Sequence, residues 1–195
     1  MEPSLVSVII PTIGRPSLKR TLESVRAQTH EPIEVIEVVD VRRRGAAWAR
    51  NDGARRARGE FLFFCDDDVR LESRALEMLV AALRRLPSAS YSYGWYVMGP
   101  HVISRVKFDA VRLRKKNFIS SMALVRASHF IGFDEKLPRW QDWDLWLRML
   151  RYGRVGAFVD AKIFETTFDP KGISGNARAL EVARGVLLKR HGIQR

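Results

Sequence analysis

Three consecutive carboxylates, Asp66 to Asp68, directly follow the apolar run from Phe61 to Cys65. Neighbouring negative charges raise one another's pKa, so three aspartates in a row are costly unless a positive group joins them. A divalent cation such as Mg²⁺ or Mn²⁺ would be such a group, because it prefers oxygen ligands from carboxylates, phosphates and water. The alternative is a solvated acidic turn that caps the next helix, and a bare triplet leaves both interpretations open.

The elements that must position the triplet form an alternating pattern in the first 87 residues. Short apolar runs that end at Pro or Asp predict buried strands, and apolar residues at helical spacing predict helices between them. We expect strands at 5–11, 33–39 and 61–65, and helices at 16–27, 46–58 and 73–86. This alternation predicts an α/β fold whose mostly parallel central sheet is flanked by helices.

The ends of the three expected strands carry the candidate binding residues. In an open parallel α/β sheet, ligands bind beyond the carboxyl ends of the strands. Pro11 and Thr12 end the first strand, Asp40 follows the second, and the acidic triplet follows the third. We therefore expect these side chains to meet at one edge of the sheet.

The pattern changes after Pro87, where the chain becomes strand-like and aromatic over residues 90–126. We expect a helix at 143–152, strands at 155–159 and 162–165, and a terminal helix at 177–190. The 195 residues contain no repeat, low-complexity tract or linker-like stretch, so we expect a single domain over 1–195. Its parts would be residues 1–87, residues 88–176 and a C-terminal helix within 177–195.

Lys and Arg outnumber Asp and Glu by 34 to 22, which gives a net charge of +12. This charge favours polyanionic partners, namely nucleic acid, an anionic membrane face or phosphorylated substrates. The basic residues are scattered, with only short clusters at Arg42–Arg44, Arg55–Arg56 and Arg112–Lys116, so a solvated, Arg-rich surface explains most of them. A hydrophobic fraction of 46% excludes a disordered chain. The single cysteine, Cys65, excludes a disulfide framework and a cysteine-built zinc site.

The location of the protein is also an expectation from composition. No apolar run approaches the roughly 20 residues needed to cross a bilayer, and the N-terminus lacks a basic-then-apolar leader. We therefore expect a cytoplasmic domain whose basic surface would permit peripheral contact with an anionic membrane.

Seven short motifs follow one another along the chain. The first is a predicted strand that ends in Pro-Thr, and the last is an Asp-Trp-Asp sequence near the beginning of a predicted helix. They are Val6–Thr12, Leu22–Thr29, Glu34–Asp40, Ala49–Ala54, Ala57–Asp68, Gly132–Glu135 and Trp140–Arg148. Together they resemble the GT-A-fold inverting glycosyltransferases of the family-two group. The resemblance covers nearly everything up to about residue 160. Each segment alone is weak evidence for the family. The order and spacing of the seven segments make the resemblance specific.

The resemblance implies a nucleotide-sugar donor, a UDP- or GDP-sugar, bound at the sheet edge. Pro11 and Thr12 match the first-strand end that approaches the nucleotide, and Asp67 would join this donor site. Asp40 matches the carboxylate that reads the nucleobase, and an acidic strand-end turn is its alternative. Arg50 falls in the family's Ala-Arg-Asn segment near the base or the phosphates, and a surface helix arginine is its alternative.

The resemblance also implies a metal site and a general base. Asp66 and Asp68 match the DxD motif that holds Mn²⁺ or Mg²⁺ on the donor diphosphate, and Asp67 could replace either of them. Asp142 matches the general base, which accepts the proton of the acceptor hydroxyl as its oxygen attacks the anomeric carbon. The alternative is that Asp142 or Asp144 is only a first-turn acid of the following helix, and we assign that structural role to Asp144.

The chain departs from the family pattern at three places. After Asp40 the usual Asp-Gly-Ser turn and the next helix and strand are missing, and residues 41–45 lead straight into the Ala-rich helix. Base recognition would then differ, and the arginines of this loop become candidates for contacts with donor phosphates. Gln141 stands where an acidic residue is commoner, and residues 164–174 lack the late histidine that some relatives place near the metal.

These observations predict a metal-dependent inverting glycosyltransferase that moves a sugar from a nucleotide-diphosphate donor to a hydroxyl of a glycan or lipid-linked acceptor. Residues 1–87 would bind the donor, and residues 88–176 would supply the acceptor site and the base. One alternative is a nucleotidyltransferase of similar sheet architecture, although residues 11–16 lack its Gly-rich loop with Arg and Lys. The other is a non-catalytic, basic nucleic-acid-binding module, and nucleic acid is not the partner we expect.

Overall fold

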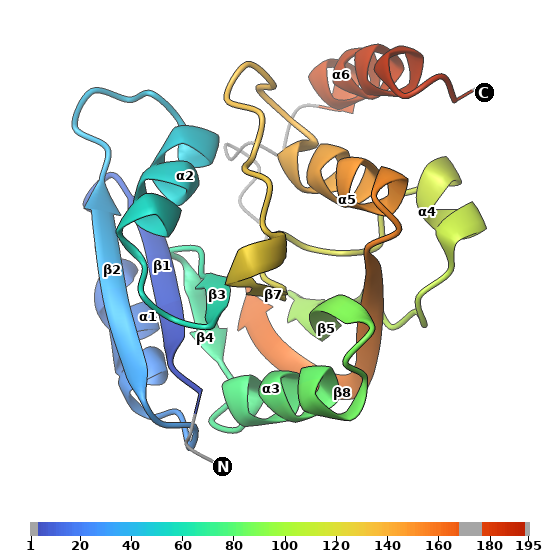
Figure 1. Cartoon of the computed structure of the whole chain (residues 1–195). Coiled ribbons are helices and arrows are strands. Elements are labelled where there is room, and N and C mark those ends of the chain that lie inside the picture. Colours follow the sequence, from blue (N-terminus) through green and yellow to red (C-terminus); the bar gives the residue numbers. More distant parts are fainter. Residues whose placement is uncertain (1–3, 168–176, 194–195) are drawn as a thin grey trace.

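The structure is a computed structural model that describes residues 4–167 and 177–193. Eight strands form one sheet in the order β2-β1-β3-β7-β5-β8-β4, with β6 paired to β5 (Figure 1). The strands are β1 Val6–Thr12, β2 Ile33–Val39, β3 Phe61–Phe64, β4 Val69–Leu71, β5 Ala89–Met98, β6 His101–Ile103, β7 Leu124–Arg126 and β8 Val155–Thr166. The helices are α1 Leu18–Arg26, α2 Ala46–Arg56, α3 Ala75–Arg85, α4 Ala110–Lys115, α5 Gln141–Arg151 and α6 Ala177–Arg190, with a 3-10 turn at Ala127–His129.

The α/β fold with a helix-flanked central sheet is confirmed, and the sheet itself is mixed rather than mostly parallel. β1 pairs in parallel with β2 and β3, and β5 pairs in parallel with β8. β7 lies antiparallel between β3 and β5, while β4 and β6 pair antiparallel with β8 and β5. Consequently, the five long or central strands β1, β2, β3, β5 and β8 run in one direction, and their carboxyl ends share one edge. The three antiparallel strands have only three residues each, too few to show a periodic pattern in the sequence.

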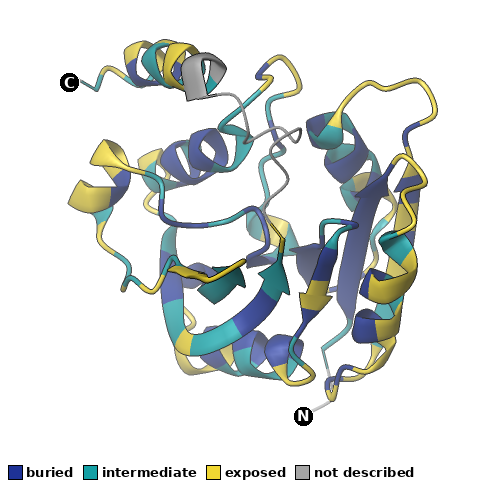
Figure 2. Ribbon diagram, turned by 180° about the vertical axis from the view of Figure 1, so that it is seen from behind, coloured by how far each residue is buried: buried dark blue, intermediate teal, exposed yellow. Residues whose placement is uncertain are grey.

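Each face of the sheet buries its own apolar cluster, because successive side chains of a strand point to opposite faces. In β1, Ile9 belongs to the cluster on the face that α2 and α5 cover. Its neighbours Val8 and Ile10 belong to the cluster on the α1 and α3 face. Figure 2 shows the central strands β1 and β3 and the inner sides of the helices buried, whereas the edge strand β2 is partly exposed and the outer sides of the helices are exposed. Both faces are therefore covered, which accounts for the continuous apolar runs in β1 and β3.

Several boundaries differ from the sequence-based expectation. β2 and α6 have the expected bounds, whereas the two strands expected at 155–159 and 162–165 are one strand, β8. The helix expected at 143–152 begins earlier, at Gln141, and α4 and β4 were not expected. The single-domain organisation and its functional division stay predictions.

Gly53 lets α2 lie directly on β1. A methyl group at this position would overlap Cγ2 of Ile9 and lie 3.2 Å from Cγ2 of Val38. We therefore expect Gly53→Ala to reduce the free energy of unfolding by about 1–3 kcal/mol, despite the better helix propensity of alanine. Urea denaturation measures this change. A variant as stable as the wild type would show that α2 does not depend on this close approach.

Candidate active site

A cavity of about 490 Å³ opens at the shared carboxyl edge of β1, β2, β3, β5 and β8. Every residue that the sequence assigned to a site lines this cavity. They are Pro11, Thr12, Asp40, Arg50, Asp66, Asp67, Asp68 and Asp142. The fold therefore brings together residues separated by up to 131 positions in the chain. Their placement is a property of the structure, and their roles stay predictions.

Two carboxylates of the acidic triplet are held by firm protein contacts. The Asp66 carboxylate accepts a hydrogen bond of 2.6 Å from the Arg50 guanidinium, within an ion pair. The buried Asp67 carboxylate accepts one of 2.6 Å from the hydroxyl of Thr12. Thr12 in turn accepts a hydrogen bond from the amide of Gly14, which fixes its hydroxyl. The end of β1 is thus tied to the end of β3.

Asp68 is the least constrained member of the triplet. Its nearest cationic partner is Arg15, at 3.5 Å, and 38% of its side chain is exposed. Partial burial raises the pKa of Asp68, and the negative charges of Asp66 and Asp67 raise it further. A nearby cation would stabilise the ionised form of such a carboxylate, because it offsets the repulsion between the three negative charges.

The triplet does not form a metal site by protein groups alone. In the part of the chain that the structure describes, no group of three or more His, Cys, Asp or Glu side chains is arranged to hold a metal ion. The donor set fits a hard cation that takes one or two carboxylate oxygens from the protein and the rest from phosphate and water. Asp68, partly exposed in the cavity wall, has the freedom that such a ligand needs.

Asp40 is buried and fixes the loop of residues 41–45, which we call the arginine loop. Its two carboxylate oxygens accept hydrogen bonds from the amides of Arg44, at 2.9 Å, and Gly45, at 2.7 Å. Arg43, which also lines the cavity, adopts a left-handed φ of 51° in this loop. These contacts give Asp40 a structural role at the strand end, which was the alternative interpretation, while leaving it on the cavity wall.

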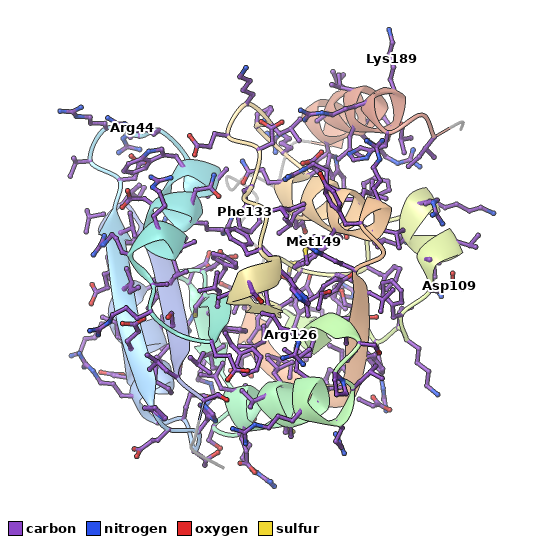
Figure 3. All side chains as sticks on the ribbon, in the orientation of Figure 1. Arg44, Asp109, Arg126, Phe133, Met149 and Lys189 are labelled. Atoms are coloured by element: carbon purple, nitrogen blue, oxygen red, sulfur yellow. The ribbon has the colours of Figure 1, made fainter. Side chains whose placement is uncertain are left out.

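Arg50 is buried, so the interpretation as a surface helix arginine is wrong. Only 8% of the residue is exposed, and its guanidinium lies 5.4 Å from the ring centroid of Phe133. Figure 3 places Phe133 in the interior between α2 and α5. Besides its pair with Asp66, Arg50 donates a long hydrogen bond of 3.4 Å to Gln141. Among the described residues its buried Nε atom has no hydrogen-bond partner, which is unusual for a buried donor and favours an anionic ligand here.

Asp142 occupies the first turn of α5 on another wall of the same cavity. One carboxylate oxygen accepts a hydrogen bond of 2.8 Å from the side-chain amide of Asn117. The other accepts one of 2.8 Å from the backbone amide of Trp143. Burial raises the pKa of Asp142, although these two hydrogen bonds and the positive charge of Arg50 oppose the change. A carboxylate with a raised pKa that lines a cavity has the properties of a general base.

Asp144, only two residues further on, lies outside this cavity. It is fully buried and accepts hydrogen bonds from Arg148, at 2.6 Å, and His191, at 2.9 Å. Arg190 lies 3.7 Å from the same carboxylate. Asp144 therefore anchors α6 and the residue that follows it to α5, a contact that goes beyond the first-turn acid expected from the sequence.

Sequence reasoning missed several other residues of the cavity wall. Asn117 and Gln141 contact Asp142 and Arg50 from behind the cavity wall; Asn117 carried no motif, and Gln141 lay in the Trp140–Arg148 segment without an assigned role. Tyr96 stacks on Phe164 with ring centroids 4.5 Å apart, and both line the cavity. The remaining wall residues that had no assigned role are Ile13, Arg15, Gly45, Ala46, Ala49, Val69, Met98, Ser120, Ser121, Thr166 and Thr167. The segment 168–176, which includes most of the stretch where some relatives place a late histidine, lies outside the described residues.

The sequence matches the profile of the family described as "Glycosyl transferase family 2" over residues 38–137, which is more than half of the chain. The chain belongs to glycosyltransferase family 2. This match includes the acidic triplet and Arg50, whereas Asp142 lies beyond its end.

Two similar proteins are described as uncharacterised glycosyltransferases. An uncharacterised glycosyltransferase of Rickettsia felis is 28% identical over 77% of this chain and 32% of its own length. One of Haemophilus influenzae is 25% identical over 75% of this chain and 62% of its own length. The chain thus spans about a third of the Rickettsia protein and less than two thirds of the Haemophilus protein.

Solved structures show the same fold. TarS of S. aureus in complex with UDP-GlcNAc has a TM-score of 0.74 at 17% identity, over 93% of this chain and 65% of TarS 1–349. The mannosyltransferase PcManGT of Pyrobaculum calidifontis, in complex with GDP-Man and Mn²⁺, has a TM-score of 0.71 at 18% identity. That match covers 97% of this chain and 63% of the mannosyltransferase. The expected GT-A architecture is confirmed by these likenesses. Within the described residues, no helix combines the length and the apolarity that crossing a membrane requires.

Proposed function

We propose that this chain is a metal-dependent inverting glycosyltransferase. It would move a sugar from a UDP- or GDP-sugar to a hydroxyl of a glycan or lipid-linked acceptor. The observation that carries the proposal is that the acidic triplet, Arg50 and Asp142 line one cavity at the carboxyl edge of the sheet. The family membership supports the reaction class. TarS was solved with UDP-GlcNAc and PcManGT with GDP-Man and Mn²⁺, which supports the donor class.

In this proposal the end of β1 and the arginine loop hold the nucleotide. Pro11 and Thr12 would approach it from the strand end, and Asp40 would keep the loop in place while facing the nucleobase. Arg50, with its unpartnered Nε in the cavity wall, would donate a hydrogen bond to the diphosphate. A phosphate-bearing donor also suits the strongly basic chain, because positive charge attracts anionic ligands.

Asp68 would be the principal metal ligand, with Asp66 as the second and Asp67 as a contributor to the donor site. The cation, when bound, would offset the charge that develops on the leaving diphosphate. Asp66 is already paired with Arg50, and Asp67 already accepts a hydrogen bond from the Thr12 hydroxyl, so Asp68 has the carboxylate most available for the cation.

Asp142 would act as the general base. It would accept the proton of the acceptor hydroxyl while that oxygen attacks the anomeric carbon from the face opposite the leaving diphosphate, in one inverting step. Asn117 and the Trp143 amide fix the orientation of the carboxylate. The protein would work in the cytoplasm, where both nucleotide sugars and a peripheral contact with an anionic membrane would be accessible. Neither the nucleotidyltransferase nor the nucleic-acid-binding alternative has an observation of its own in the structure.

A thermal-shift screen of nucleoside diphosphates with and without Mn²⁺ tests the proposal. A nucleotide at a hundred times its Kd should raise the Tm by about 5–10 °C, and Mn²⁺ should be required for most of that rise. Asp68→Asn should lose the Mn²⁺-dependent part. Glu23→Gln, which removes an exposed carboxylate on α1, is the matched control and should behave like the wild type. The proposal fails if no nucleoside diphosphate or nucleotide sugar changes the Tm of the wild type.

The pH dependence of transfer should respond to Asn117. Its hydrogen bond lowers the pKa of Asp142 against the effect of burial, so Asn117→Ala should raise that pKa. A base works only when it is deprotonated, and the acid limb of the kcat/KM profile should therefore move to higher pH. Above the limb, activity should fall by less than about tenfold, since one hydrogen bond is lost. An unmoved limb would show that Asp142 is not the group that titrates.

A further inference from the structure

The chain concentrates positive charge in one exposed stretch that the proposed chemistry does not use. We call residues 105–116 the basic segment; it holds six basic residues and a single acidic one, Asp109. The basic residues are Arg105, Lys107, Arg112, Arg114, Lys115 and Lys116, and all six are exposed. No other twelve-residue window of the sequence combines so many cations with a single acid.

The two carboxylates near the basic segment, those of Asp109 and Asp160, already have partners. Asp109 caps α4, where its carboxylate accepts a hydrogen bond of 2.9 Å from the amide of Arg112. Figure 3 places Asp109 at the outer edge of the molecule. Asp160 forms an ion pair with Arg105, at 2.8 Å. The other five cations have no carboxylate within 4 Å among residues 4–167 and 177–193, which leaves a concentrated, uncompensated positive face.

The basic segment joins two walls of the active-site cavity. Just before it in the chain, Tyr96 and Met98 of β5 line the cavity, and just after it Asn117 holds the carboxylate of Asp142. α4 is packed beside α5, because the indole of Trp143 donates a hydrogen bond to a carbonyl of α4 (Figure 1). The positive face therefore lies on the side of the cavity where Asp142 lies, away from the β2 edge.

Apolar side chains accompany the charges. In α4, Leu113 is fully buried and anchors the helix, whereas Val111 is 61% exposed. Val102 of β6, just before the basic segment, is 56% exposed. Exposed apolar residues interleaved with Lys and Arg are typical of surfaces that lie in the headgroup region of a bilayer. Nucleic-acid sites instead use exposed aromatic rings for stacking, and the one aromatic residue of the segment, Phe108, packs against the core.

From this charge complementarity we propose that the basic segment, with Val102, docks the protein on an anionic phospholipid bilayer. Lys107, Arg112 and the three cations that follow would contact lipid phosphates, and the two exposed valines would enter the headgroup layer. The docking depends on the segment's own charges. Its consequence rests on the proposed function: the docked protein would present the Asp142 side of its cavity to an acceptor held in the membrane.

Vesicle sedimentation tests the docking with the full chain. Vesicles of phosphatidylcholine alone should bind weakly, and vesicles with about 30% phosphatidylglycerol should bind in a salt-sensitive way. Each basic residue near such a surface contributes roughly fivefold in partitioning, so Arg112→Gln/Lys115→Gln/Lys116→Gln should lose on the order of a hundredfold. The matched control, Lys19→Gln/Arg26→Gln/Arg85→Gln, removes three exposed charges from α1 and α3 and should lose far less.

The outcomes separate this proposal from its rivals and from the proposed function. Equal losses in both triple variants would mean that net charge alone drives binding, and would overturn the docking surface. Binding of a single-stranded RNA that the segment variant weakens, without binding of anionic vesicles, would show a nucleic-acid surface and also overturn it. The nucleotide-dependent rise in Tm should be unchanged in the segment variant. Its absence in the wild type would instead count against the proposed function.

Discussion

Asp142→Asn should reduce transfer by about 10²–10⁴-fold, which is what a positioned general base contributes. Asparagine has the same shape, and its side-chain oxygen can still accept the hydrogen bond from Asn117 or from the Trp143 amide. It cannot take a proton from the acceptor hydroxyl. The affinity for the nucleotide and the Tm should stay near wild-type values, because the loss is confined to the chemical step. Initial-rate kinetics and a thermal-shift titration on the same preparation measure both.

The matched control for this prediction is Asp52→Asn, an aspartate on α2 whose carboxylate only pairs with Arg55 and Arg56 at the surface. Its transfer rate should stay within roughly twofold of the wild type. Wild-type turnover by Asp142→Asn would refute the base assignment. A variant that lost nucleotide binding together with activity would instead place Asp142 in the donor site.

The second large effect is on stability. Asp144→Asn should lower the free energy of unfolding by about 3 kcal/mol, because it leaves Arg148 and the buried His191 without the charge that faces them. Asp160→Asn, which breaks the exposed pair with Arg105, is the matched control and should change stability much less. Urea denaturation at neutral pH measures both. Equal stability of Asp144→Asn and the wild type would show that the anchoring of α6 adds nothing.

The free energies of unfolding of the wild type and Asp144→Asn should become more similar at acid pH. Burial by itself raises the pKa of Asp144, but the hydrogen bonds from His191 and Arg148 outweigh it and lower the pKa overall. A pKa lowered by folding stabilises the protein above the unfolded value, about 3.9, and that contribution is lost as the pH falls through the folded value. The stability difference between wild type and Asp144→Asn should therefore be full at neutral pH and shrink below about pH 4.

Most of the first half of the fold could be predicted because its elements, apart from β4, have a strong local signal. β1 and β3 are apolar runs and β2 is rich in Val and Ile; the three end at Pro-Thr or before an aspartate, and helix-forming segments lie between them. The strands β4, β6 and β7 have three residues each and depend for their existence on pairing with neighbours, which no local pattern records. This is why the mixed character of the sheet was not foreseen.

The candidate site shows a similar division. Residues in motifs at strand ends could be located, because parallel strands bring their carboxyl ends to one edge. Asn117 could not, since a lone asparagine in a loop carries no pattern, and the fold alone brings it to Asp142. Asp142 and Asp144 have similar local surroundings in the sequence, and only the family resemblance distinguished them. Two positions apart on a helix means nearly opposite sides, so one lines the cavity and the other enters the core.

The central claim is that the acidic triplet holds a cation on a diphosphate bound at the carboxyl edge of the sheet. Anomalous diffraction from crystals grown with Mn²⁺ and the nucleoside diphosphate chosen by the thermal-shift screen tests it most directly. The claim predicts the diphosphate in the cavity at the carboxyl edge of the sheet. It also predicts a manganese peak at coordination distance, about 2.1 Å, from an Asp68 carboxylate oxygen. A nucleotide bound elsewhere on the molecule, or a manganese ion that does not contact the acidic triplet, would contradict it.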